Sequence, residues 1–267
     1  QKKATSSFFL IAISLLLVIL LSIPRLTGIS ATSIQLNAAN EPPSLAHLFG
    51  TDDLGRDLLA RITLGTKISF IVGMIAALLD LLVGLVYGMI AALVSRKKGE
   101  FLMRIADVIY CIPTTLIMIL AITVFGPGLL AITIGFCCSS WINMARIMRG
   151  QIMSLKERNF VIFSQTLGAS NWWLIRYHFI PNSVEIILST ITYSIVKAIF
   201  MEAFLSFVGL GLSHPQVSLG GLIAEGTANL DFYPWRLFFP ASVISLLIFL
   251  LNQLAENIKN FVVPEKE

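Results

Sequence analysis

Apolar runs of membrane-spanning length follow one another along most of this chain. A helix needs about 20 predominantly apolar residues to cross the hydrocarbon core of a bilayer. The runs that reach or approach that length cover residues 8–23, 68–94, 105–125, 129–148, 183–208 and 237–258. Of the 267 residues 13% are charged, whereas about a quarter are charged in a typical soluble domain. The pattern predicts an all-α integral membrane protein with six transmembrane helices.

The lysines and arginines are distributed unequally between the two predicted sides. The segments predicted to lie inside contain Lys2, Lys3, Arg96, Lys97, Lys98, Arg104, Arg146, Arg149, Lys156, Arg158, Arg176, Lys259 and Lys266; those predicted to lie outside contain Arg25, Arg56, Arg61, Lys67 and Arg236. Because positively charged loops stay in the cytoplasm, both termini are predicted to be cytoplasmic. These cations lie scattered between apolar runs and form no basic groove lined with aromatic residues, which argues against nucleic-acid binding.

The sequence contains no motif for nucleotide binding or catalysis. The phosphate-binding pattern Gly-x-x-x-x-Gly-Lys-Ser/Thr does not occur. Cys111, Cys137 and Cys138 have no other Cys or His at metal-binding spacing, and no catalytic constellation is evident. We therefore expect no enzymatic activity and no cofactor or metal on this chain, so that any energy from ATP has to come from another subunit.

A polar and basic segment, residues 158–182, separates the fourth and fifth apolar runs. Phe160, Phe163, Ser164 and Leu167 fall at the spacing i, i+3, i+4, i+7, which predicts a short helix with one narrow apolar face. Gly168 can end this helix, because glycine adopts the left-handed conformation at little cost. The segment therefore begins as an amphipathic helix whose apolar face requires a partner.

A second short helix is predicted in the same segment. Ser170 and Asn171 can cap it, residues 172–177 form it, and Pro181 is expected to interrupt it. The product is a helix-turn-helix at the inner membrane surface. A cytoplasmic protein is the expected partner of its apolar face.

Asp80 lies near the middle of the second apolar run, on a face of small residues. The neighbours at every fourth position on this face are Ala76, Gly84, Gly88 and Ala92. Small residues allow close helix packing, and an ionisable group at this depth should face protein or water. A hydrogen-bonded, structural carboxyl is the favoured interpretation, with a partner on another helix; contact with substrate or protons is the alternative.

Polar residues also interrupt the fifth apolar run, where Lys197, Glu202 and Ser206 are candidates for helix packing or for the lining of a pathway. Five residues separate Lys197 from Glu202, which places the two side chains on different faces of a helix. We expect Glu202 to serve packing and Lys197 to be the better candidate for facing substrate.

The segment before the second run is polar and contains the string Gly50, Thr51, Asp52, Gly55, Arg56 and Asp57. Asp52 or Asp53 can cap a helix start, and Arg56 can pair with Asp57. Taken residue by residue, the string predicts a capped amphipathic helix on the outer surface.

Three segments resemble a known family, the permease subunits of binding-protein-dependent ABC importers. The segment from Gly168 to Pro181 is similar to the family's cytoplasmic coupling loop; here Ile162, Phe163 and Ser164 replace its Glu-Ala-Ala, and His178 replaces an Ile. The Gly-Thr-Asp-x-x-Gly-Arg-Asp string and the stretch from Glu202 to Gly211 resemble the C-type permease subunit of dipeptide, oligopeptide and nickel importers. Leu219 lies where a Trp is usual.

The resemblance implies a fold, partners and a function. Residues 1–66 would form a first transmembrane helix and an extracytoplasmic segment, residues 67–258 a type I permease domain with the coupling loop 158–182, and residues 259–267 a cytoplasmic tail. The implied partners are a homologous permease, two cytoplasmic ATPase subunits that bind ATP, and an extracytoplasmic binding protein. Peptides would be imported across a bacterial inner membrane.

Two alternative functions are left open by the sequence. The same architecture could import nickel or another metal chelate. A protein of another class, a proton-coupled secondary transporter, could use Asp80, Lys197 and Glu202 as a relay. Such a transporter would not require the coupling loop.

Overall fold

A computed structural model describes residues 15, 18, 22–24, 26, 28–212 and 216–262. The predicted first span, residues 8–23, lies almost entirely outside the described residues, as do residues 263–267 of the predicted tail. The chain divides into two compact units. The first contains the described residues up to Val72 and those within Pro127–Leu129 and Ile199–Gln253; the second contains Gly73–Gly126, Leu130–Ala198 and the described residues from Leu254.

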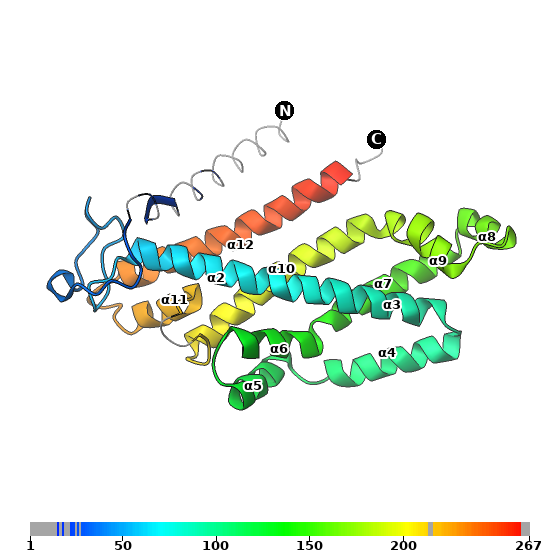
Figure 1. Cartoon of the computed structure of the whole chain (residues 1–267), viewed down its shortest axis with the longest axis horizontal. Coiled ribbons are helices and arrows are strands. Elements are labelled where there is room, and N and C mark those ends of the chain that lie inside the picture. The colour runs from blue at the N-terminus through cyan, green and yellow to red at the C-terminus, as the bar shows by residue number, and fades with distance from the viewer. Residues whose placement is uncertain are drawn as a thin grey trace. The chain divides into compact units, whose positions relative to one another are not determined.

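The described residues form helices, turns and loops, with no strand among them (Figure 1). The α-helices are α2 (Leu58–Leu79), α3 (Leu85–Leu93), α4 (Arg96–Tyr110), α5 (Thr114–Phe125), α6 (Leu129–Ser139), α7 (Trp141–Lys156), α8 (Asn159–Thr166), α9 (Asn171–Leu174), α10 (Val184–Phe207), α11 (Leu219–Thr227) and α12 (Trp235–Val262). Two π-helices, η2 (Asp80–Gly84) and η3 (Ile175–Phe179), and two 3₁₀ turns, η1 (Leu36–Ala38) and η4 (Pro181–Ser183), lie between them.

Four helical segments are long and apolar enough to cross a bilayer: Leu58–Leu93, Leu129–Lys156, Pro181–Phe207 and Trp235–Asn257. The pair α4 and α5 is a fifth candidate if the two helices form one span, although they are bent by 69°. These segments coincide with five of the predicted spans, so the chain is a multi-pass membrane protein. The count of six and the side of each terminus stay predictions.

The second unit is built around the packing of η2 and α3 against α7. Gly84 and Gly88 make this close approach possible, because a Cβ atom at either position would lie 2.5 Å from a backbone oxygen of α7. Met144, Met148 and Ile152 on α7 are fully buried in the adjoining core. η2 and α3 therefore contribute glycines to this contact, and α7 contributes backbone oxygens and methionine side chains.

The first unit packs the start of α2 with α11 and the start of α12. Ile62 and Leu219 are fully buried, and the rings of Phe49 and Phe239 stack with centroids 4.0 Å apart. Ser218 caps α11, since its Oγ accepts a hydrogen bond of 3.2 Å from the backbone N–H of Gly221. This core fixes the polar segment that precedes α2.

Helix boundaries differ from the predicted ones where charged residues or prolines were involved. The second span was expected from residue 68, but α2 begins at Leu58, so the predicted domain boundary at residue 66 falls inside this helix. Arg61 was assigned to the outside segment, whereas it lies within α2, where ion pairs with Asp52 and Glu225 neutralise it. Pro113 lies within the predicted span 105–125, but it separates α4 from α5 and precedes the first residue of α5.

Candidate functional site

The coupling loop, residues 158–182, contains α8 in the place where the sequence predicts the amphipathic helix. Val161 is fully buried and anchors α8 to the core of the second unit. Phe160, Phe163 and Leu167 are exposed, Phe163 to 69% and Leu167 to 89%. Large apolar side chains with this exposure, in a loop expected to be cytoplasmic, are suited to contact another protein.

Ser164 was expected on the same docking face, but its hydroxyl is engaged elsewhere in the loop. It lies 2.8 Å from Nε2 of His178. The His178 ring also contacts the rings of Phe160 and Trp173, with centroid distances of 5.2 and 5.0 Å. His178 therefore holds α8 against α9, a role that the sequence reasoning missed. One signal was available in the sequence, because Ser164 and His178 both depart from the family pattern. In the structure these two residues contact each other.

Gly168 ends α8, as the sequence predicts. Its φ angle is +87°, in the left-handed region that glycine adopts most easily. The N–H of Ala169 donates to the carbonyl of Ser164 at 3.0 Å, and the N–H of Gly168 donates to that of Gln165 at 2.9 Å. These two bonds form a Schellman motif, which satisfies carbonyl groups at the helix end and reverses the chain.

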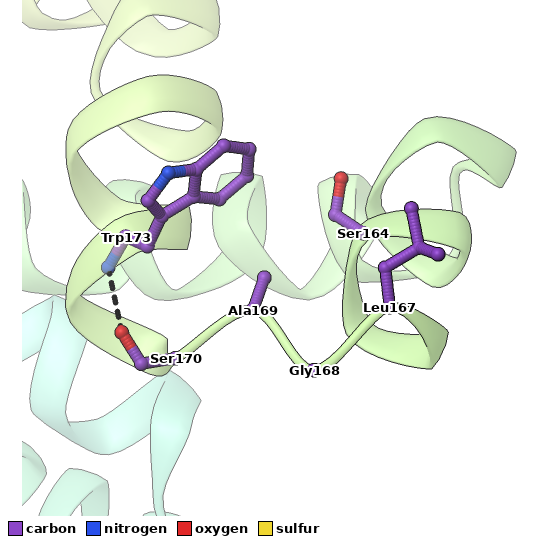
Figure 2. A pocket seen from close by; sticks show the side chains of 6 residues that line it. All are labelled: Ser164, Leu167, Gly168, Ala169, Ser170 and Trp173. Carbon is purple, nitrogen blue, oxygen red and sulfur yellow. Dashed lines mark hydrogen bonds between the residues drawn. The ribbon is translucent and has the colours of Figure 1, made fainter.

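A groove of about 410 Å³ lies at this chain reversal. Figure 2 shows Ser164 and Leu167 on one side and Trp173 on the other, with the backbone from Gly168 to Ser170 between them. Ser170 is the predicted cap of the second helix, and its Oγ accepts a hydrogen bond of 3.3 Å from the Trp173 N–H. The groove combines an apolar wall, an indole and several small residues.

The second helix ends before Pro181, as predicted, since η3 ends at Phe179 and Pro181 begins a separate 3₁₀ turn. The chain runs from α9 through η3 into η4, in which Pro181 is the first residue, and then into α10. Proline is tolerated at the first position of a helical turn because its missing N–H would have no partner there. Pro181 therefore begins the helical path into α10.

The string of residues 50–57, called here the signature segment, is organised around the carboxylate of Asp52. Oδ1 of Asp52 accepts hydrogen bonds of 2.9 Å from the N–H groups of Leu54 and Arg56. Oδ2 accepts bonds of 2.6 Å from Nε of Arg56 and from Nη1 of Arg61. The predicted pairing of Arg56 with Asp57 is thus replaced by one with Asp52.

Asp57, rather than Asp52 or Asp53, caps the following helix. Its Oδ1 accepts a bond of 2.8 Å from the N–H of Ala60 in α2, and its Oδ2 lies 2.9 Å from Nδ1 of His47. No amphipathic α-helix forms within the signature segment, where the backbone turns at Gly55 with a φ of +71°. A Cβ atom at Gly55 would lie 1.8 Å from the carbonyl oxygen of Gln35, so this turn requires glycine.

Arg61 links the signature segment to α11. It is only 1% exposed, and its guanidinium binds both carboxylate oxygens of Glu225 at 2.6 and 2.9 Å as well as Asp52. Arg236 on α12 adds a bond of 2.9 Å to Asn40. The sequence reasoning did not single out Arg61, Glu225 or Arg236, since 164 residues separate the first two.

Asp80 is buried and bonded to a different helix segment. Its carboxyl lies in η2 and is hydrogen bonded to the hydroxyl of Ser140, at the junction of α6 and α7. Ser194 and Lys197 on α10 are close enough to interact with the same carboxyl. This placement matches the structural interpretation of Asp80 and adds Lys197 to its surroundings.

Glu202 and Ser206 lie together in the first unit. Glu202 is 0% exposed, and its two oxygens accept hydrogen bonds of 2.7 Å from the hydroxyls of Ser69 and Ser206. Buried polar groups that are fully hydrogen bonded commonly fix the packing of helices. The arrangement agrees with a packing role for Glu202, and Ser69 is its unpredicted partner.

The fold and these sites define a multi-pass helical membrane protein. The family described as "Binding-protein-dependent transport system inner membrane component" matches residues 84–265, and the chain belongs to this family.

Curated relatives cover nearly the whole chain. The chain is 41% identical over 256 residues to the oligopeptide transport system permease protein OppC of Bacillus subtilis, covering 96% of this chain and 84% of the relative. It is 39% identical over 243 residues to the dipeptide transport system permease protein DppC of the same organism, covering 91% of this chain and 76% of the relative.

Solved structures confirm the fold class. A chain from inward-facing conformations of the MetNI methionine ABC transporter superimposes with a TM-score of 0.61 at 16% identity, covering 77% of this chain and 96% of that chain. A chain from an amino acid ABC transporter solved with histidines gives a TM-score of 0.59 at 15% identity, covering 75% of this chain and 94% of that chain. The predicted ABC importer permease fold is therefore correct.

Proposed function

We propose that this chain is one permease subunit of an ATP-driven peptide importer in a bacterial inner membrane. It pairs with a homologous permease, and the two chains form the translocation pathway between them. An extracytoplasmic binding protein delivers the peptide. ATP binds to two cytoplasmic ATPase subunits, and this chain itself binds no nucleotide. The identities to oligopeptide and dipeptide permeases support peptides over a nickel chelate as the substrate.

The exposed apolar face of the coupling loop is the observation that carries this proposal. Phe163 and Leu167 project from α8, while Val161 on the opposite side is fully buried. His178 and the Schellman motif at Gly168 hold α8 and α9 together around the groove. A rigid element of this kind can transmit the closure of two ATPase subunits to the membrane helices, because its docking side chains cannot move independently of the bundle.

The loop joins two helical segments that are long enough to cross the membrane, Leu129–Lys156 and Pro181–Phe207. α7 leads into α8 at its carboxyl end, and η3 and η4 lead from α9 into α10. A displacement of the coupling loop therefore acts on both α7 and α10. We expect α10 to contribute to the pathway, with Lys197 as the candidate residue for facing substrate.

A secondary transporter driven by protons is not supported. Membership of a binding-protein-dependent family argues for a multisubunit importer. Each carboxyl of the suggested relay is also occupied by hydroxyl groups: Asp80 by Ser140, and Glu202 by Ser69 and Ser206.

The proposal is tested by replacing Phe163 with Asp in the assembled importer. A charged side chain on the docking face should uncouple ATP hydrolysis from transport, and peptide uptake by proteoliposomes should fall at least tenfold. Phe163→Leu, which keeps the face apolar, should retain most of the uptake. Because Phe163 is largely exposed, both variants should insert and assemble normally.

Two results would contradict the docking assignment. One is full uptake by the Phe163→Asp variant at a normal level of assembly. The other is that the two wild-type permease chains purify as a pair but without any ATPase subunit.

A further inference from the structure

α4 presents an exposed apolar stripe that no described part of the chain covers. Phe101, Ile105 and Val108 are exposed at the spacing i, i+4, i+7, Phe101 to 64% and Val108 to 70%. Gly99, Met103 and Ala106 are buried on the opposite side of the helix and face α3 and α7. At about 100° per residue, the two stripes lie roughly 180° apart.

The polar side chains of α4 give the helix a basic character. Arg96, Lys97, Lys98 and Arg104 are cationic, whereas Glu100 and Asp107 are acidic. Both carboxylates are already paired: Glu100 lies 3.0 Å from Arg96, and Asp107 lies 2.6 Å from Arg146 on α7. Lys97, Lys98 and Arg104 form no ion pair with any carboxylate in the described part of the chain.

The position of α4 in the chain places this surface at a membrane boundary. The apolar segment Leu58–Leu93 ends three residues before Arg96, and the apolar helix α5 follows a bend of 69°. Figure 1 shows α4 returning alongside α3. The basic start of α4 is therefore at the depth where α3 leaves the hydrocarbon core, and the apolar stripe follows toward that core.

We propose that α4 binds anionic phospholipids of the cytoplasmic leaflet. Acyl chains cover Phe101, Ile105 and Val108, and the headgroups meet Lys97, Lys98 and Arg104. An apolar stripe combined with neighbouring lysines and arginines is the pattern by which helices recognise an anionic membrane interface. Charge complementarity selects this occupant over a neutral lipid, because the unpaired cations have no protein partner among the described residues.

Contacts between α4 and α7 connect the proposed lipid site to the helix that leads into the coupling loop. Asp107 and Tyr110 on α4 both engage Arg146 on α7, through the ion pair and through a guanidinium placed 4.1 Å from the tyrosine ring centroid. α7 continues directly toward α8. The lipid contact itself does not depend on the docking of an ATPase, so the two proposals can fail separately.

Native mass spectrometry of the purified importer complex tests the proposal directly. The complex is exposed to equal amounts of phosphatidylglycerol and phosphatidylethanolamine, and the ratio of the two bound lipids is measured. Each cationic side chain near an anionic surface contributes about fivefold to lipid affinity. The triple variant Lys97→Gln, Lys98→Gln and Arg104→Gln should therefore lower the ratio by about tenfold or more.

Glu100→Gln is the matched control, and its expected effect on the lipid ratio has the opposite sign. It removes an acidic group from the same helix and should raise the phosphatidylglycerol ratio severalfold. Lys67→Gln, at an exposed lysine of α2, should leave the ratio unchanged. An unchanged ratio in the triple variant, or equal losses in the triple variant and Lys67→Gln, would overturn the proposal.

Spin labels in the complex in nanodiscs identify what covers the stripe. A label at Phe101→Cys or Val108→Cys, in a background without Cys111, Cys137 and Cys138, should be accessible to oxygen and protected from a water-soluble nickel chelate. Protection from both reagents would mean that a protein partner occupies the stripe, and accessibility to the chelate would mean that water does. Either result would overturn the proposal.

Discussion

The signature segment and the coupling loop are both polar interruptions between apolar helices, yet they are stabilised in opposite ways. In the signature segment the central carboxylate, that of Asp52, is buried and paired with Arg56 and Arg61. In the coupling loop the aromatic side chains and the hydroxyls of Ser164 and Ser170 form internal contacts, and Phe163 and Leu167 are left exposed.

This contrast separates a structural role from a docking role. A network whose charges pair with one another is not stabilised further by an external partner. Removing one of its members leaves a buried charge without a counter-charge. Substitutions on an exposed apolar face do not lower the stability of the chain itself. They have an effect only when a partner binds to that face. The variants below test this distinction, from the largest expected effect on stability to the smallest.

Arg61→Ala should have the largest effect. It leaves the buried carboxylate of Asp52 with one cation fewer and removes the bidentate contact with Glu225. Breaking a buried ion pair from one side costs about 3–5 kcal/mol. The thermal unfolding midpoint of the detergent-solubilised permease should fall clearly.

Arg96→Ala is the control for that experiment. Arg96 also pairs with a carboxylate, but its side chain is 88% exposed, and surface pairs contribute about 0–1 kcal/mol. If Arg61→Ala lowered the unfolding midpoint no more than Arg96→Ala, the structural role of the buried network would be wrong.

His178→Ala should have an intermediate and local effect. It removes the contact with Ser164 and two aromatic contacts, together worth about 2 kcal/mol. Amide hydrogen exchange across residues 159–183 should accelerate while exchange in α3 stays slow. Ser164→Ala removes only the hydroxyl. It should lower the free energy of local opening by about half as much as His178→Ala does. Unchanged exchange in both variants would exclude His178 as the residue that joins α8 to α9.

Gly168→Ala should have a smaller effect, confined to the end of α8. A non-glycine residue at a φ of +87° costs about 1–2 kcal/mol. Apart from the adjacent residues, no atom lies within 4 Å of the added Cβ, so the cost comes from the local backbone conformation alone. Exchange of the Gly168 and Ala169 positions should accelerate. An unchanged rate would mean that the chain reversal does not need the left-handed residue.

Phe163→Asp should have the smallest effect on stability, with an unfolding midpoint within error of the wild type. The side chain is mostly exposed, and surface substitutions usually change stability by no more than about 0.5 kcal/mol. The same variant is expected to lose coupled transport. A large drop in the midpoint would show that Phe163 belongs to the folded core and would remove the contrast between the two regions.

Local features of the coupling loop could be predicted because they depend on neighbouring residues. The positive φ of Gly168 and the cap at Ser170 both follow from short-range stereochemistry. Pro181 follows the end of the second helix, as predicted, and is also the first residue of the next helical turn. The continuation of this turn into α10 is not specified by the local sequence.

The partners of buried charges could not be predicted, because they come from distant parts of the chain. Sequence analysis correctly required a partner for Asp80 on another helix, but Ser140 is 60 residues away and could not be named. The same holds for Ser69 and Glu202, which are 133 residues apart. The start of α2 was missed for a related reason: Arg61 can be buried in this helix because Asp52 and Glu225 neutralise its charge.

The π-helix η2 has a consequence for the stripe of small residues on α2 and α3. Positions spaced by four drift by about 40° per step around an ideal α-helix, so a stripe of five such residues would wind away from its contact surface. A π turn accommodates one extra residue and rotates the following positions back by about 100°, or roughly two and a half of these steps. Ala76, Asp80, Gly84, Gly88 and Ala92 are all buried, as this correction of the helical phase requires. Deleting one residue between Asp80 and Gly84 would restore an ordinary α-helix and turn the two glycines about 100° away from α7.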